Sequence, residues 1–319
     1  MATATISTAK HAPEALQKFA WIVVGYNVLV IIWGALVRAT GSGAGCGNHW
    51  PLCNGEVIPL SPRIDTIIEF THRMMTGGAG FIVVGLLIWI FRTMAKGKAA
   101  RVAAVISTVL LVNEALLGAL LVKLGYVTGN QSTGRVVMLS IHLSNTLLLL
   151  GSLVLTAVLV GTGQTTDELH LRGKKAAWTV IGLVATIIVG VSGSLAALGD
   201  TLFPASSLRA AMEQDLSSSS PLLLRLRGIH PLSAVIAAVF VMWLVAQAKK
   251  IGAARLGTAV IVLLCAQFGL GLLDVVLLAP TWMQILHLLG ADLYWVALVM
   301  LAARLIWPQA AQHNTALSS

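Results

Sequence analysis

The chain has 319 residues, of which 57% are hydrophobic and only 10% are charged, with a net charge of +9. A soluble domain carries roughly 25% charged residues. This composition, with a mean hydropathy of +0.87, excludes an ordinary soluble protein and predicts an integral membrane protein in a lipid bilayer.

Eight stretches of the chain are long and apolar enough to cross a bilayer, which takes about 20 residues in a helix. The predicted spans are residues 20–39, 66–91, 102–122, 138–160, 177–198, 224–247, 256–278 and 282–306. The expected fold is therefore all-α, with eight transmembrane helices.

Positive charge is distributed unevenly over the loops. The terminal segments and the loops 92–101, 161–176 and 248–255 hold thirteen Lys and Arg residues, whereas the loops on the other side hold seven. Because basic residues concentrate on the cytoplasmic side of a membrane, we expect both termini in the cytoplasm and the long loops 40–65 and 199–223 outside. This bias accounts for the net charge, so no nucleic-acid partner is expected.

The two halves of the chain resemble each other. Matching positions, first half before second, are Gly34 and Gly193, Glu114 and Gln267, and Gly118 and Gly271. A repeat of four helices re-enters the membrane with unchanged orientation, which predicts parallel repeats. We therefore expect two pseudo-symmetric four-helix bundles, residues 1–162 and 163–319.

Four histidines lie in the even-numbered spans: His72, His142, His230 and His287. Each lies four to six residues from the predicted outer end, or about 6–9 Å at the helical rise. An ionisable residue within a membrane indicates a functional site, and neutral imidazole is a ligand of iron. Facing helices of a bundle can hold a haem. We predict that His72 with His142, and His230 with His287, ligate haem iron; interhelical hydrogen bonding is the alternative.

The residues that precede the first histidine of each half differ in charge. Glu69 lies one turn before it in the first half, and Arg227 takes that place in the second. A carboxylate in an apolar site acts as a base or stabilises developing positive charge; the alternative is that Glu69 only pairs with Arg73 or orients a ligand. The three arginines Arg73, Arg225 and Arg227 suit contacts with haem propionates.

Two of the three cysteines, Cys46 and Cys53, lie in the loop 40–65. In an oxidising compartment a disulfide is the default interpretation, and a zinc site with His49 and Glu56 is less favoured. The sequence does not decide between a structural and a redox-active pair. The third cysteine, Cys265, is expected to be a small core residue.

Three acidic residues within the spans are given no role by the sequence. Glu114, Asp274 and Asp292 are expected to line the bundle interior or to pair with neighbouring helices.

Three segments of the first half carry a family resemblance. They are Gly34-Ala35-Leu36-Val37-Arg38-Ala39-Thr40-Gly41-Ser42-Gly43, the loop that runs from Cys46 through Trp50-Pro51-Leu52-Cys53-Asn54-Gly55, and Glu69-Phe70-Thr71-His72-Arg73. With the later His142, His230 and His287, the chain resembles haem A synthases over residues 20–306. These bacterial cell-membrane enzymes oxidise a methyl group of haem o to a formyl group, giving haem a for terminal oxidases.

The resemblance implies a role for each site residue. His230 and His287 would ligate a resident haem b cofactor, His72 and His142 would bracket the haem o substrate, and Glu69 would lie near the reacting methyl group. The methyl group would be hydroxylated twice with oxygen from water, and the diol would lose water. Electrons would pass to an acceptor that the sequence does not identify, and a haem o synthase would deliver the substrate.

The resemblance also covers the cysteine loop. The pair Cys46 and Cys53 matches a family disulfide near the substrate site, whereas a second pair that some members carry in the later outer loop is absent from this sequence.

Two other functions remain open at this point. A dihaem b-type electron-transfer cytochrome would use the same four histidines but gives no role to Glu69 or to the cysteine loop. A transporter would fit parallel repeats, but the sequence lacks the pair of Gly/Pro-broken helices expected at its binding site.

Overall fold

The structure is a computed structural model that describes residues 13–169 and 172–307; the terminal segments that enter the predicted charge bias lie partly outside this range. Ten α-helices make up most of this part of the chain. They are α1 Glu14–Ala39, α2 Ile64–Thr93, α3 Ala99–Lys123, α4 Thr133–Thr162, α5 Lys174–Leu202, α6 Leu208–Leu216, α7 Leu222–Arg227, α8 Ile229–Lys250, α9 Ala254–Val276 and α10 Thr281–Ile306.

The prediction of eight membrane-spanning helices is confirmed by length and composition: α1 to α5, α7 with α8, α9 and α10. Several of these helices begin some residues before the apolar stretch that predicted them. In α4 the side chain of Ser132 caps the helix by accepting a hydrogen bond from the Arg135 N–H, at 3.3 Å, so the polar first turn is helical as well.

The spanning helices begin earlier than the predicted spans, so each histidine lies further from the start of its helical segment than from the predicted end of its span. They lie six to nine residues after the first residue of α2, α4, α7 or α10. This separation is about 9–14 Å along the helix axis.

The sixth span, predicted as one helix over 224–247, is broken. Helix α7 ends at Arg227 and α8 begins at Ile229, with Gly228 between them. Pro231 has no N–H to donate to the carbonyl of Arg227, and its ring crowds that carbonyl. The break places His230 in the first turn of α8.

The loop before α7 also differs from the sequence-based expectation. Its Ser217–Ser220 run follows a two-turn helix, α6, that the apolar pattern did not predict. The side chain of Ser207 caps α6 by accepting a hydrogen bond from the N–H of Ala210, at 3.1 Å.

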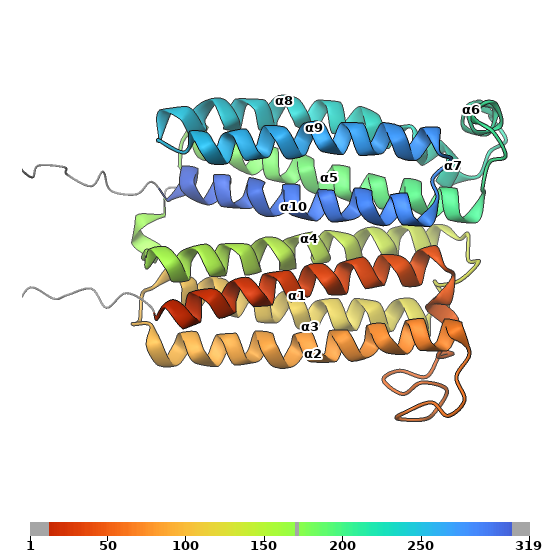
Figure 1. The fold of residues 1–319 in the computed structure, drawn as a ribbon, viewed down its shortest axis with the longest axis horizontal. Coiled ribbons are helices and arrows are strands. Elements are labelled where there is room, and N and C mark those ends of the chain that lie inside the picture. Colours follow the sequence, from red (N-terminus) through yellow and green to blue (C-terminus); the bar gives the residue numbers. More distant parts are fainter. Residues whose placement is uncertain (1–12, 170–171, 308–319) are drawn as a thin grey trace, which may run out of the picture.

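The long helices lie side by side in two groups (Figure 1). Helices α1 to α4 form one group and α5, α8, α9 and α10 the other, and α1 and α4 contact α5 and α10 along the seam. The loops 40–63 and 203–221 lie at one end of the bundle, called here the loop end; α1 begins and α10 ends at the opposite end.

The core lies along the seam between the groups. Leu150 and Leu153 of α4 and Leu298 and Leu301 of α10 are almost fully buried. The indole N–H of Trp295 crosses the seam to donate to the carbonyl of Leu147, at 2.9 Å. Apolar packing and few polar links are what hold helices together when their outer faces are in lipid.

The outer faces of the helices are apolar. Phe81, Val239 and Leu272 are each about two thirds or more exposed, as expected for side chains that face lipid tails. Cys265 lies on this surface of α9 and is exposed. The expectation that Cys265 is a core residue is therefore wrong, because the face of α9 that carries it contacts no other helix closely.

Candidate functional site

The four histidines come from α2, α4, α8 and α10. In the second half, the ring centroids of His230 and His287 lie 6.3 Å apart and the ring planes are almost perpendicular, at 83°. In the first half, His72 of α2 and His142 of α4 lie in the same helix group. The structure thus brings the predicted pair of the second half together, and the pairing of His72 with His142 stays a prediction.

Each imidazole packs against a glycine of the preceding membrane-spanning segment, which for His230 is α5. A Cβ atom at the glycine position would lie 2.7 Å from the His230 ring at Gly193, 3.0 Å from the His72 ring at Gly34, 3.3 Å from the His287 ring at Gly271 and 3.9 Å from the His142 ring at Gly118. The rings therefore use space that a larger residue would occupy. The repeat marked these glycines in the sequence, but not their contact with the histidines.

In the second half, the Nδ1 atom of each histidine has a polar neighbour. Nδ1 of His230 lies 3.2 Å from the carbonyl oxygen of Val189 and 3.3 Å from the hydroxyl of Ser192. One terminal atom of the Gln267 amide lies 3.3 Å from Nδ1 of His287. Both rings are therefore oriented through Nδ1.

In the first half, Nδ1 forms no hydrogen bond to any residue that the structure describes, at either His72 or His142. The carboxylate of Glu114 lies 3.5 Å from Nδ1 of His142, close enough for electrostatic attraction but in a geometry that makes no hydrogen bond. Glu114 instead accepts hydrogen bonds from Asn145, at 2.6 Å, and from Thr146.

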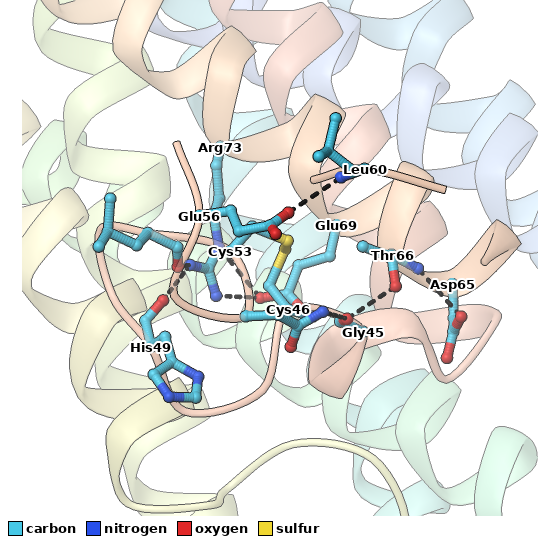
Figure 2. Close-up of a disulfide and its surroundings, with 12 residues drawn as sticks. Gly45, Cys46, His49, Cys53, Glu56, Leu60, Asp65, Thr66, Glu69 and Arg73 are labelled. Atoms are coloured by element: carbon cyan, nitrogen blue, oxygen red, sulfur yellow. Dashed lines mark hydrogen bonds and ion pairs between the residues drawn. A yellow bond between two sulfur atoms is a disulfide. The ribbon is translucent and has the colours of Figure 1, made fainter. Parts of the chain in front are cut away.

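Glu69 is buried, with 4% of its surface exposed, and its two oxygens have different partners. One accepts a hydrogen bond from the backbone N–H of Cys46, at 2.8 Å, and the other pairs with the guanidinium of Arg73. Figure 2 shows this carboxylate between α2 and the cysteine loop. The pairing with Arg73 that the sequence left open is thus present, together with a contact that it did not suggest.

The cysteine loop is fastened to α2 at several points (Figure 2). The sulfur atoms of Cys46 and Cys53 are bonded. Arg73 donates to the carbonyls of His49 and Leu52, each at 2.7 Å, from the helix beneath. The Glu69–Arg73 pair therefore positions the loop that covers the loop end of the first half.

All three arginines predicted to bind propionates have protein partners. Arg73 pairs with Glu69, and Arg225 donates to backbone carbonyls, including that of Ser220 at 3.0 Å. Arg227 forms ion pairs with Asp200, at 2.7 Å, and Asp215, at 2.6 Å. A propionate contact at any of these positions stays a prediction.

Three further polar residues, Asp292, Asp274 and Arg38, lie in the second half or contact it. Asp292 is 1% exposed, and one of its oxygens has no hydrogen-bond partner in the part of the chain that the structure describes; the same holds for one oxygen of Asp274. Arg38 reaches across the seam from α1 and donates to Thr201, at 3.2 Å, and to Gln284, at 3.0 Å.

Within residues 13–169 and 172–307, no group of three or more His, Cys, Asp or Glu side chains gathers as a metal cluster. The zinc alternative for Cys46, Cys53, His49 and Glu56 therefore finds no support.

A family model described as cytochrome oxidase assembly protein, COX15-CtaA, matches residues 17–299, which is most of the chain. The chain belongs to this family. Heme A synthases of several bacteria are among its curated relatives, so the family is the one that the sequence resemblance indicated.

Three relatives show how far the similarity extends. A protoheme IX farnesyltransferase of Thermus thermophilus is 45% identical over 293 residues, which are 90% of this chain and 48% of that protein. A heme A synthase of Bacillus licheniformis is 33% identical over 57% of this chain and 58% of its own. One of Shouchella clausii is 49% identical over 29% of this chain and 31% of its own.

The chain thus spans about half the length of the first curated relatives it matches. Family membership rests on the match over residues 17–299. The activities in the relatives' names belong to those proteins.

Proposed function

We propose that the chain is a haem A synthase, a membrane oxidoreductase that converts a methyl group of haem o to a formyl group. The observation that carries the proposal is the geometry of His230 and His287, whose ring centroids are 6.3 Å apart at 83°. Membership of the family, with heme A synthases among the relatives, supports this choice of chemistry.

The spacing of His230 and His287 would allow both imidazoles to hold one iron. A metal–imidazole bond is about 2.0–2.1 Å long, and the ring centroid lies roughly 1.1 Å beyond the bonded nitrogen. Two imidazoles on one metal would therefore have centroids at most about 6.4 Å apart, and those of His230 and His287 are 6.3 Å apart. Facing helices of a four-helix group can hold a porphyrin between them.

The second-half pair, His230 and His287, would hold haem b, which would supply one-electron transfer when bound. The protein's contribution there is to fix two neutral imidazoles and to exclude water. The site lies near the loop end, which we propose faces outward, with both termini in the cytoplasm of a bacterium. The two groups of helices correspond, on this proposal, to a substrate half, 1–162, and a cofactor half, 163–319.

His72 and His142 are proposed to bracket the haem o substrate in the first half. Glu69 lies one helical turn from His72, and the cysteine loop covers that end of α2. The porphyrin would enter between helices whose outer faces contact lipid, which suits a substrate with a long apolar tail.

The proposed reaction adds oxygen from water to the substrate methyl group. Two successive hydroxylations give a diol, which loses one water to leave the formyl group. In sum, one methyl group and one water become one formyl group, four protons and four electrons. The electrons pass to an acceptor outside the chain, and the substrate comes from a haem o synthase partner.

Glu69 acts, on this proposal, through its charge. Positive charge that develops on the reacting carbon is stabilised by a fixed carboxylate nearby. The bonds to Cys46 and Arg73 hold both oxygens in place, so Glu69 serves as an oriented negative charge rather than as a mobile base.

The alternative is a dihaem b-type electron-transfer cytochrome. It would use both histidine pairs but would give no role to the buried carboxylate of Glu69 and the fastened loop, which the first half has at the place where the second half has Arg227. This difference between the halves favours a substrate site over a second relay.

The test is conversion of haem o by the purified protein. The protein is incubated with haem o and a chemical one-electron oxidant, and the haems are extracted and identified by mass and by pyridine haemochrome spectrum. We expect a formyl haem whose new oxygen carries the label when the reaction is run in ¹⁸O water. Haem o that stays unchanged, beside a bound haem b, would support the cytochrome.

A further inference from the structure

Arg38 carries a positive charge into the seam between the two helix groups. Its guanidinium, which belongs to α1 of the first half, donates to the hydroxyl of Thr201 in α5, at 3.2 Å, and to the side-chain oxygen of Gln284 in α10, at 3.0 Å. An arginine within a membrane-spanning helix is costly and indicates a functional site. Arg38 is therefore a candidate for a binding residue.

The guanidinium of Arg38 has uncharged hydrogen-bond partners. In the part of the chain that the structure describes, no carboxylate forms an ion pair with it. Asp200 is the neighbour of Thr201 in the chain, but it binds Arg227, at 2.7 Å. Asp200 and Asp274 attract Arg38 only from beyond ion-pair distance. A guanidinium has five N–H groups, and two of them are used here, so donors and charge remain for an anion.

The two acceptors lie on the loop-end side of the second-half histidines. Gln284 precedes His287 by three residues on the same face of α10, which is about 4.5 Å along the helix axis. Thr201 follows Gly193, which packs against the His230 ring, by eight residues of α5, or about 12 Å. The guanidinium that binds them therefore lies between the two imidazoles and the loop end of the bundle.

The anion that suits this position is a propionate of haem. A haem carries two propionate carboxylates on one edge of its porphyrin, and a guanidinium can bind a carboxylate with two parallel hydrogen bonds. The arginines that the sequence suggested for this contact are already bound: Arg73 and Arg227 to carboxylates, and Arg225 to backbone carbonyls. Arg38 differs from Arg73 and Arg227 because it is not paired with a carboxylate.

We propose that Arg38 binds a propionate of the haem held by His230 and His287, an inference that rests on the proposed haem ligation. The first half then contributes a residue to the cofactor site of the second half. Four residues before Arg38, the same helix carries Gly34, which packs against the His72 ring. Helix α1 therefore contacts a histidine of the proposed substrate pair and the proposed cofactor within about one turn.

The experiment compares two ligands that differ in charge: haem b, and its dimethyl ester, in which both propionates are neutral. The full-length protein with His72→Ala and His142→Ala, called here the second-half protein, keeps one histidine pair. It is loaded in detergent with either ligand, and transfer of the ligand to excess apomyoglobin is followed in the Soret band. The release rates are measured with Arg38 and with Arg38→Leu.

Arg38→Leu should speed the release of haem b by about 10–100-fold, because a charge-assisted contact is lost. It should change release of the dimethyl ester little, and this unchanged rate would show that the variant still folds around a porphyrin. Arg38→Lys, which restores the charge without the planar fork, should recover part of the haem b effect. The control Arg209→Leu, at an exposed ion pair with Glu213, should change neither rate.

A second full-length protein, with His230→Ala and His287→Ala, keeps the first-half pair, and there Arg38→Leu should leave the release of haem b unchanged. Acceleration in this protein as large as in the second-half protein would overturn the proposal, because Arg38 would then serve the substrate site. Equal acceleration of haem b and its ester, which a structural role predicts, would overturn it too, as would unchanged rates. If the second-half protein with Arg38 intact binds neither ligand, the proposed function fails and this inference with it.

Discussion

At the scale of single residues, the site is defined by what each polar atom contacts. Glu69 illustrates this point, because the sequence allowed it to be a base, an electrostatic stabiliser or a partner of Arg73. The structure binds both of its oxygens, to Arg73 and to the N–H of Cys46. A carboxylate fixed in this way stabilises charge but does not move to collect a proton.

Replacing Glu69 should therefore abolish product formation without emptying the cofactor site. In Glu69→Ala we expect haem b content unchanged and formyl haem lost, because the fixed negative charge is absent while the second half is untouched. Haem content is measured by pyridine haemochrome and product by mass. The control Glu56→Gln, in the cysteine loop, should retain activity, and an active Glu69→Ala protein would refute the assignment.

The distances between the glycines and the histidine rings predict effects of different size for two glycine substitutions. In Gly193→Ala the new methyl would lie 2.7 Å from the His230 ring, whereas in Gly118→Ala it would lie 3.9 Å from the His142 ring. The first distance is a clash that displaces a ligand, and the second is ordinary contact. We expect Gly193→Ala to lower the haem-to-protein ratio several-fold and Gly118→Ala to leave it unchanged. Equal ratios would show that the rings do not need this space.

At the scale of elements, the cysteine loop and α2 act as one unit. A disulfide that closes a loop of this length stabilises it by about 2.5 kcal/mol in the chain-entropy account, and Arg73 binds two further carbonyls of the same loop.

Removal of the disulfide should loosen the loop alone. For Cys46→Ser with Cys53→Ser, we expect faster proteolysis within 40–63 and lower product formation, because the N–H that binds Glu69 is less well fixed. The haem b content should equal that of the parent protein. Loss of that haem together with the loop would show that the two halves depend on each other more than the contacts indicate.

The sequence predicted the positions of the spanning helices better than it predicted which of their faces pack against other helices. Apolar length is sufficient to locate eight spans, because a bilayer imposes it on every spanning helix. It did not locate α6, which is polar, or the break at Gly228, which depends on Pro231. Cys265 was misplaced because hydropathy does not say which face of an apolar helix meets lipid.

For the candidate site, the sequence predicted which residues belong to it but not how their side chains are oriented. The histidines stood out because an imidazole within a membrane span is costly, and their repeat suggested the pairs. The contacts of Glu114 and Gln267 required the structure, since Asn145 and Thr146 reach Glu114 from a neighbouring helix.

At the scale of the whole molecule, the two groups of helices meet at a seam that is apolar in its core and polar near the loop end. Arg38 of α1 donates to Thr201 of α5 and Gln284 of α10 there. Hydrogen bonds from a charged donor contribute about 1.5–3 kcal/mol each in favourable settings, so this residue is a main polar link across the seam.

Loss of this link should destabilise the protein as a whole. For Arg38→Leu we expect a thermal unfolding midpoint lower by several degrees in detergent, with both groups affected, because Gln284 loses its partner. Arg209→Leu, at an exposed ion pair with Glu213, is the control and should leave the midpoint unchanged. A midpoint for Arg38→Leu equal to that of the control would mean that apolar packing alone holds the seam.

The central claim is that imidazoles of separate helices meet in pairs around the iron of a porphyrin. The most direct test is the optical and electron paramagnetic resonance spectrum of the purified protein beside His287→Ala. We predict a six-coordinate, low-spin ferric haem in the parent protein, and loss of that haem or a change to high spin in His287→Ala. A parent protein with no Soret absorbance, or a variant with an unchanged low-spin spectrum, would contradict the account.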